Sequence, residues 1–243
     1  PGTDSAFPGA VEFDNAGNAI VMITTDLGNG GVGKQRAELV FRPAGGSFGA
    51  PSPVYTTIGD ANLNQDGQLG LYDIAFDGAG NAVVGFAENS FAFNQDRDWS
   101  RLHGFGRSAA GAIEQPTKII ANRNTNRAVN AVQVSISGSR QVATFGREVG
   151  AGTGEVEYVT RTQSGLEWSG YRTLAGDFND PRKAPAAGNL STDAAGNAII
   201  GVTDVQPPPG TPPVPREFFL PANSRDFTAA RPRSMYADPS FRA

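Results

Sequence analysis

The chain has 243 residues, 39% of them hydrophobic, with a formal net charge of −4 and a pI of about 5.1. This acidic balance argues against a nucleic-acid partner, which needs a clustered basic surface. No apolar run in the sequence approaches the roughly 18 residues of a membrane span. The absence of cysteine excludes disulfides, thiolate catalysis and Cys-ligated zinc.

The sequence also suggests where the protein works. It opens at Pro1 rather than Met and shows no signal peptide, which we interpret as a mature or trimmed form whose targeting segment has been removed. Arginine greatly outnumbers lysine, a composition that hints at a GC-rich bacterial genome. We therefore expect a bacterial protein that is secreted or lies at the cell surface.

A seven-residue phrase recurs along the chain and predicts a repeat. It occurs as Phe13–Ala19, Phe76–Ala82 and Thr192–Ala198, each with Asp second, Gly fifth and Asn sixth. A worn copy, Ile136–Val142, fills the gap between the second and third copies. The spacing predicts four units of about 60 residues, at roughly 1–59, 60–121, 122–180 and 181–243, as in propellers and other repeat architectures.

The first half of each unit is expected to form a hairpin. Its first strand alternates in polarity and comprises, in chain order, Val11–Phe13, Ile74–Phe76, Val134–Ile136 and Leu190–Thr192. The Asp-x-x-Gly-Asn phrase then makes a tight turn, because Gly and Asn tolerate positive φ and Asp accepts backbone N–H groups. The second strand is nearly all apolar, which predicts burial on both faces, and comprises Ala19–Ile23, Ala82–Phe86, Val142–Phe145 and Ala198–Val202.

The second half of each unit adds two more strands after a variable loop. The third strand comprises Ala37–Arg42, Leu102–Arg107, Glu157–Arg161 and Glu217–Leu220. A weaker fourth strand is expected near 51–54, 116–120, 171–174 and 230–235. Four antiparallel strands per unit, repeated four times, predict an all-β propeller that forms a single domain over residues 1–243. The alternatives are part of a larger propeller, or a ring completed by a second chain.

The repeat also resembles a known class of blade. The phrase Phe13–Ala19, with Phe41–Pro51 after it, looks like the tandem propeller repeats of secreted bacterial proteins. It is similar, more loosely, to NHL and Asp-box blades. The resemblance covers nearly the whole chain and implies the propeller fold, but these blades serve many roles and carry no fixed catalytic motif.

One segment that departs from the repeat fits a calcium-binding loop. Residues 62–73 place oxygen-bearing side chains at positions 1, 3, 5 and 12 of a twelve-residue pattern, with Gly at position 6. The expected ligands are Asn62, Asn64, Asp66, Gln68 and Asp73. A polar loop between blades, held by an Asx turn and without a cation, is the alternative interpretation.

A second departure is an aromatic segment at residues 88–100. Phe91, Phe93 and Trp99 stand among charged residues there, which suits a sugar platform or a protein contact. A small satellite core that covers a blade edge is the alternative. The proline-rich stretch at 205–216 predicts a stiff spacer or a docking segment.

Recurrent arginines mark the third strands. Arg42, Arg107 and Arg161 end three of the four. They could ring a channel and attract anions, but a structural bond within or between blades is the favoured interpretation.

Recognisable catalytic machinery is missing from the sequence. His103 is the only histidine, and we expect it to be packed on a third strand. A conventional zinc site and a Cys–His pair are therefore excluded. Acids expected in loops could serve glycosidase chemistry, which needs two carboxylates: Asp60, Asp66, Asp73, Glu88, Asp96, Asp98, Asp177 and Asp180.

The function expected from the sequence is a non-catalytic binding or adhesion module, whose ligand is a carbohydrate or another protein. The protein is therefore not expected to be an enzyme, and calcium is the one cofactor considered. A structural component that assembles with a partner chain or a second copy is the first alternative. A glycan-active hydrolase that uses loop carboxylates is the second.

Overall fold

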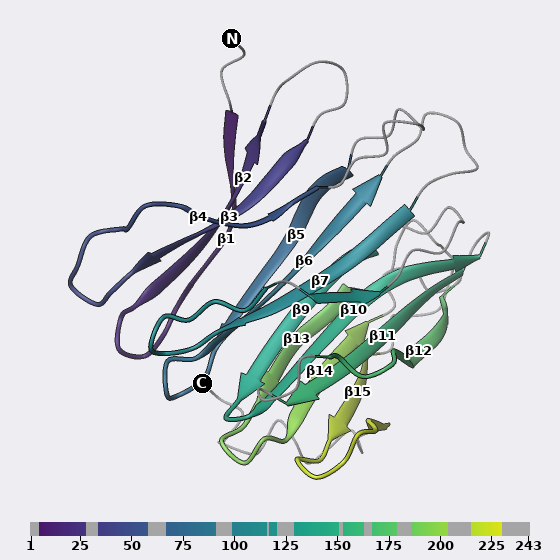
Figure 1. Ribbon diagram of the computed structural model, residues 1–243. Helices are drawn as coiled ribbons and strands as arrows, with labels where there is room; N and C mark the ends of the chain where they lie inside the picture. The colour runs from purple at the N-terminus through teal and green to yellow at the C-terminus, as the bar shows by residue number, and fades with distance from the viewer. Residues whose placement is uncertain are drawn as a thin grey trace. The chain divides into compact units, whose positions relative to one another are not determined.

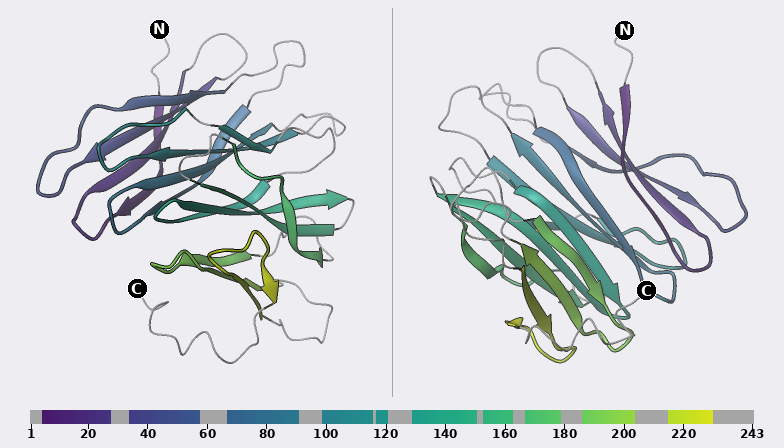
Figure 2. Two further views of the ribbon diagram at one scale, coloured as in Figure 1. Left: turned by 60° about the horizontal axis from the view of Figure 1, so that its bottom comes forward. Right: turned by 180° about the vertical axis from the view of Figure 1, so that it is seen from behind.

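The computed structural model describes residues 5–27, 34–57, 67–90, 99–115, 117–120, 129–150, 153–162, 167–178, 186–203 and 215–229. These residues form 16 strands and no helix, arranged as four antiparallel sheets of four strands (Figure 1). Two further views show the strands of each sheet side by side in chain order (Figure 2). No helix long and apolar enough to cross a membrane occurs in this part of the chain.

The chain divides into two compact units, Pro1–Val129 and Asn130–Ala243. Unit 1 contains sheet 1, made of β1 (Ser5–Phe13), β2 (Ala19–Asp26), β3 (Gln35–Arg42) and β4 (Ser52–Thr56). It also contains sheet 2, made of β5 (Gly67–Phe76), β6 (Ala82–Ser90), β7 (Trp99–Arg107) and β8 (Thr117–Ile120).

Unit 2 repeats this arrangement. Sheet 3 consists of β9 (Val129–Ser137), β10 (Arg140–Gly150), β11 (Thr153–Thr162) and β12 (Arg172–Phe178). Sheet 4 consists of β13 (Ala186–Thr192), β14 (Ala198–Thr203), β15 (Pro215–Leu220) and β16 (Thr228–Ala229). One hydrophobic cluster of unit 2 packs Val156 of sheet 3 against Ile200 and Val202 of sheet 4.

The predicted all-β class, with one four-stranded antiparallel sheet per repeat, is confirmed. Burial of the second strands on both faces is confirmed as well, since Val83 and Val84, neighbours on β6, are both 0% exposed. Each sheet is open within the described residues, and closure into a four-bladed propeller stays a prediction. The fourth strand of the last repeat differs from its predicted place: β16 ends at Ala229, and residues 230–235 lie outside the described part.

The repeated phrase works as a clamp between two turns. In sheet 1, Asp14 accepts hydrogen bonds from the backbone N–H groups of Ala16 (3.0 Å) and Asn18 (2.8 Å), and from the side-chain amide of Asn18 (2.6 Å). Gly17 takes the positive φ of 87° that closes the turn. The side-chain oxygen Oδ1 of Asn18 then accepts a hydrogen bond from the N–H of Ala44, in the turn that follows β3 (2.8 Å).

The other intact copies repeat this clamp. Asp77 and Asp193 bind their asparagines in the same way, and those asparagines accept the N–H groups of Ala109 and Ala222. In the worn copy Arg140 instead donates to the carbonyls of Gly196, Pro221 and Ser224, which lie in the turns of sheet 4. The hairpin of β9 and β10 nevertheless forms, with Gly138 at a positive φ of 54°, so this turn survives the loss of the motif's aspartate.

Sheets 1 and 2 enclose the hydrophobic core of unit 1. Alternate residues of β2 and β3 face sheet 2, and alternate residues of β6 and β7 face sheet 1. The core comprises Ile20, Met22, Ala37, Leu39, Ile74, Ala82, Val84, Phe86 and Phe105. β1 also approaches β5, and Gly9 makes that approach possible, because a Cβ there would lie 2.3 Å from Cδ2 of Tyr72.

We expect Gly9→Ala to destabilise unit 1 by about 1–3 kcal/mol, because the added methyl group would force the Tyr72 ring out of place. Gly70→Ala on β5 is the control, since no atom lies within 4 Å of the added Cβ. Urea unfolding of both variants checks this. Equal unfolding midpoints for the two variants would show that the close packing of Tyr72 on Gly9 does not contribute to the stability of unit 1.

Candidate functional site

A buried polar cluster lies between sheets 1 and 2, at the end of the strands away from the Asp-x-x-Gly-Asn turns. At its centre is Glu88, close to the end of β6, whose side chain is 0% exposed. Its Oε2 atom accepts a hydrogen bond from the Tyr55 hydroxyl (2.7 Å), and Nε2 of His103 (3.3 Å) and Nη1 of Arg101 (3.4 Å) also donate to it. We call these four residues the Glu88 cluster.

Strand register explains why these side chains meet. On β6 and β7, Glu88 pairs with Arg101 and Phe86 pairs with His103, so alternation along both strands turns all four toward sheet 1. Tyr55 comes from β4, at the edge of sheet 1. Its ring packs against His103 (centroids 4.3 Å apart), and Phe86 contacts both rings, with its centroid 5.1 Å from that of His103 and 5.6 Å from that of Tyr55.

The cluster holds Glu88 in its charged form. Burial alone would raise the pKa of Glu88, but hydrogen bonds from His103 and Tyr55 and the attraction of His103 and Arg101 outweigh it, so the pKa falls below its ordinary value of 4.5. Burial and the hydrogen bond to Glu88 have the opposite effect on Tyr55 and raise its pKa above the ordinary 10.0. At neutral pH the pair is therefore a protonated phenol against a carboxylate.

One oxygen of Glu88 remains available. Oε1 is buried and has no hydrogen-bond partner among the described residues. It lies 2.5 Å from the Cβ position that Gly67 lacks, so glycine at this position of β5 leaves the room that the carboxylate needs. Buried oxygens without a partner are rare in native proteins, and each calls for a physical explanation.

The charge of Glu88 predicts a pH-dependent stability. Because its pKa is lower in the folded than in the unfolded state, its contribution is full above about pH 4.5 and is lost as the pH falls through the folded value. We expect Glu88→Gln to destabilise the protein by about 3 kcal/mol at neutral pH, and by progressively less below pH 4.5. A difference between the two proteins that stays constant with pH, measured by urea unfolding, would show that Glu88 is not held ionised.

Sequence reasoning placed the candidate sites elsewhere. Phe91 and Phe93 lie outside the described residues, and Trp99 opens β7 opposite Ser90, with no description of its side chain. Asn62, Asn64 and Asp66 of the candidate calcium loop also lie outside. Gln68 and Asp73 lie on β5, an extended strand. Within the described residues no group of three acidic or histidine side chains could hold a metal.

Calcium binding stays a prediction with its own test. If the segment at 62–73 holds the ion, calcium at a hundred times its dissociation constant stabilises the protein by about 2.7 kcal/mol. EDTA should then lower the melting temperature, and Asp66→Asn should abolish the effect. An unchanged melting temperature after chelation would show that this segment binds no calcium.

The structure corrects the expected position of two acids and adds two residues. Glu88 and Asp73 were expected in loops, but both lie on strands, because the apolar pattern marks only the buried centre of each strand. His103 is packed on the third strand of its sheet as predicted, at 4% exposed. Tyr55 and Arg101 were missed, because Arg101 meets Glu88 through the register of β6 and β7, and Tyr55 comes from the preceding repeat.

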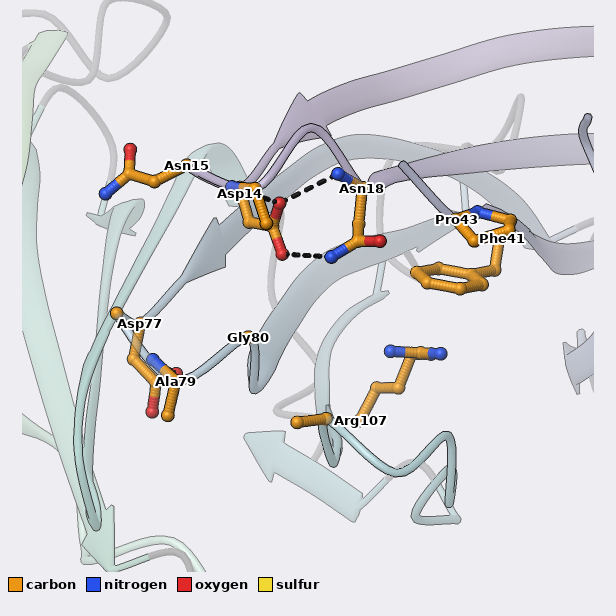
Figure 3. A pocket seen from close by; sticks show the side chains of 12 residues that line it. Asp14, Asn15, Asn18, Phe41, Pro43, Asp77, Ala79, Gly80 and Arg107 are labelled. Atoms are coloured by element: carbon orange, nitrogen blue, oxygen red, sulfur yellow. Dashed lines mark hydrogen bonds between the residues drawn. The ribbon is translucent and has the colours of Figure 1, made fainter. Parts of the chain in front are cut away.

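A cleft of about 350 Å³ lies at the opposite end of the same sheets, between the turns that carry Asp14 and Asp77 (Figure 3). Arg107 reaches into it with its guanidinium over the ring of Phe41, 3.7 Å from the centroid. Arg42 and Arg161 also lie over aromatic rings, those of Phe13, Phe48 and Trp168. These stacks support the structural interpretation of the recurrent arginines.

No protein-family model matches the sequence, and no curated protein matches it either. Among solved structures, a Hadza microbial sialidase is similar over 96% of this chain and 48% of its own, with a TM-score of 0.55 at 10% identity. A polysaccharide lyase, an ulvan lyase in complex with its sugar, is similar over 94% and 54%, with a TM-score of 0.56 at 9% identity. A levansucrase of B. megaterium is similar over 94% and 67%, with a TM-score of 0.53 at 9% identity.

At these identities the likeness shows a shared fold, and the chain spans about half the length of the sialidase and of the lyase. Even so, the comparisons contradict the predictions that the protein is a non-catalytic binding or adhesion module and that it is not an enzyme. The structures that share the fold are carbohydrate-active enzymes. The Glu88 cluster carries no local sequence motif, because it forms only when β4, β6 and β7 come together.

Proposed function

We propose that the protein is a glycan-active enzyme that hydrolyses a glycosidic bond at the Glu88 cluster. The observation that carries this proposal is the hydrogen bond of 2.7 Å from the Tyr55 hydroxyl to a buried, ionised carboxylate. The fold supports it, because the sialidase, the polysaccharide lyase and the levansucrase arrange their sheets in a similar way. Such a pairing of an acceptor with a hydroxyl is the arrangement that proton transfer requires.

The two residues would have different roles. Glu88 is fully buried, so it acts on a substrate only through another side chain, and Tyr55 is half-buried and holds the proton between them. Tyr55 does not ionise by itself at neutral pH, because its pKa is raised. We infer that its proton moves to Glu88 in the same step in which its oxygen takes a proton from the attacking water.

Hydrolysis at this site needs only water, the substrate and the side chains of Tyr55 and Glu88. The water oxygen bonds to the anomeric carbon, the glycosidic C–O bond breaks, and the departing sugar oxygen takes a proton from solvent. Glu88 then returns its proton through Tyr55 to solvent, which replaces the proton given to the departing sugar oxygen. Arg101 and His103, both hydrogen-bonded to Oε2 of Glu88, keep that carboxylate oriented and hold its charge.

The remaining sequence predictions fit this proposal. Residues 91–98, which include Phe91 and Phe93, join β6 to β7, and Trp99 is the first residue of β7. Since β6 and β7 carry Glu88 and Arg101, these three aromatic residues are candidates for a sugar platform. A β-propeller built from this bacterial repeat, as a four-bladed ring or part of a larger one, and a secreted protein that meets polysaccharides outside the cell, belong to the same proposal.

A panel of polysaccharides, with products read by mass spectrometry, tests the function. We expect Tyr55→Phe and Glu88→Gln to lower kcat by about 100- to 10,000-fold with a smaller effect on KM, because proton transfer is lost. Glu38→Gln is the matched control, since Glu38 is also a buried carboxylate, ion-paired with Arg36 at 3.1 Å.

The possible results separate cleanly. Absence of any product across the panel overturns the proposal, and equal loss in the Glu38→Gln control shows that the effect is one of stability. Products with a double bond at the new end would assign the same residue pair to elimination instead of hydrolysis. Circular dichroism of each variant shows whether it is folded.

A further inference from the structure

The cleft between the two turns of unit 1 has no part in the proposed chemistry. Ala82 begins β6 at the cleft and Glu88 lies near the other end of that strand, so the cleft is about 20 Å from the Glu88 cluster. The core side chains of Phe86 and Phe105 lie between the two sites. The volume of about 350 Å³ falls at the lower end of the range for small-ligand pockets.

Arg107 provides the donors of the cleft. Its side chain is 7% exposed and packs on Phe41, and burial lowers its pKa while the nearby charge of Asp14 raises it. Nη1 donates to the backbone carbonyl of Ser108 (3.2 Å). Arg107 makes no ion pair within the described residues, and Figure 3 shows its guanidinium pointing into the cleft. Its remaining N–H groups can therefore serve a ligand.

Two carboxylates provide the acceptors. Asp14 and Asp77 each accept three hydrogen bonds within their own turns, of the four or so that a carboxylate can accept. Oδ2 of Asp14 also faces the second turn, 3.6 Å from the Cβ position that Gly80 lacks. Each carboxylate can therefore accept about one further hydrogen bond from a ligand that lies between the turns.

In unit 2 a side chain of the protein occupies the position that corresponds to this cleft. There the turn of sheet 3 meets the turn of sheet 4, and Arg140 spans them by binding three backbone carbonyls. Ser137 adds a hydrogen bond to the carbonyl of Asp193 (2.7 Å). In unit 1 the corresponding turn keeps Asn18, which bonds within sheet 1, so no side chain of that turn bridges the gap.

The guanidinium and the two carboxylates that line the cleft together indicate which class of ligand it can bind. A carboxylate or sulfate ligand would meet two aspartates as well as Arg107, and a cation would meet the guanidinium. A neutral ring with several hydroxyl groups suits both kinds of partner, because each hydroxyl donates to a carboxylate and accepts from a guanidinium. We propose that this cleft binds one neutral sugar residue of a glycan chain, as a second carbohydrate site remote from the Glu88 cluster.

Ala79 offers a way to block the cleft without touching the fold, since it lines the cleft and is exposed. We expect Ala79→Trp to reduce the affinity for neutral oligosaccharides at least ~10-fold, and Arg107→Gln to do the same through lost hydrogen bonds. The matched control is Ala195→Trp, at the same position of the turn in sheet 4.

The experiment uses the whole chain with Tyr55→Phe as background, which lacks the proposed proton transfer and leaves Glu88 paired with His103 and Arg101, so the probes are not consumed and the result does not depend on the proposed activity. Maltohexaose, laminarihexaose and arabinohexaose are titrated by NMR, with the amides of Gly80 and Ala109 as reporters, and oligogalacturonate is added as an anionic probe. Binding that Ala79→Trp abolishes and Ala195→Trp leaves intact supports the site. No neutral binding, binding of the anionic probe alone, or binding that ignores Ala79→Trp overturns it.

Discussion

The bond between an aspartate and an asparagine four residues later underlies the order of each intact repeat. The aspartate closes the first hairpin by holding the N–H groups of its own turn, and the asparagine carries the constraint on to the turn after the third strand. Three strands of a sheet are thereby fixed in register from one end. With register fixed, every side chain further along the strands has a defined face.

Between sheets 1 and 2, the strand register determines where apolar and polar side chains lie. The face that carries the core residues Val84 and Phe105 also carries Arg107 toward the turns and Glu88 toward the other end. A hydrophobic centre thus separates two polar ends with different properties. One end is buried and holds a carboxylate ionised, and the other is an open cleft with donors and acceptors on its walls.

Much of the fold follows from the sequence, and little of the site does. The period, the turns and the apolar second strands are local patterns, so they predict four antiparallel sheets correctly. The pairing of Tyr55 with Glu88 joins residues of two repeats across a sheet interface, and no spacing in the sequence marks it. Glu88 moreover stands at the polar end of an apolar strand, where pattern alone gave a loop. The aromatic residues near 91–99 drew attention because they are conspicuous in sequence, and the described structure leaves that prediction as it stood.

The pKa of the Glu88 carboxyl group tests most directly whether the cluster holds this carboxylate in its charged form. It can be followed by the ¹³C resonance of that carbon in the folded protein as the pH is lowered. We expect the carboxyl group to titrate below pH 4.5, and its pKa to rise when Tyr55→Phe removes the hydrogen bond. Titration at or above pH 4.5 that Tyr55→Phe does not affect would show that Tyr55 does not hold the carboxylate in its charged form, and the proposed proton transfer would then be wrong.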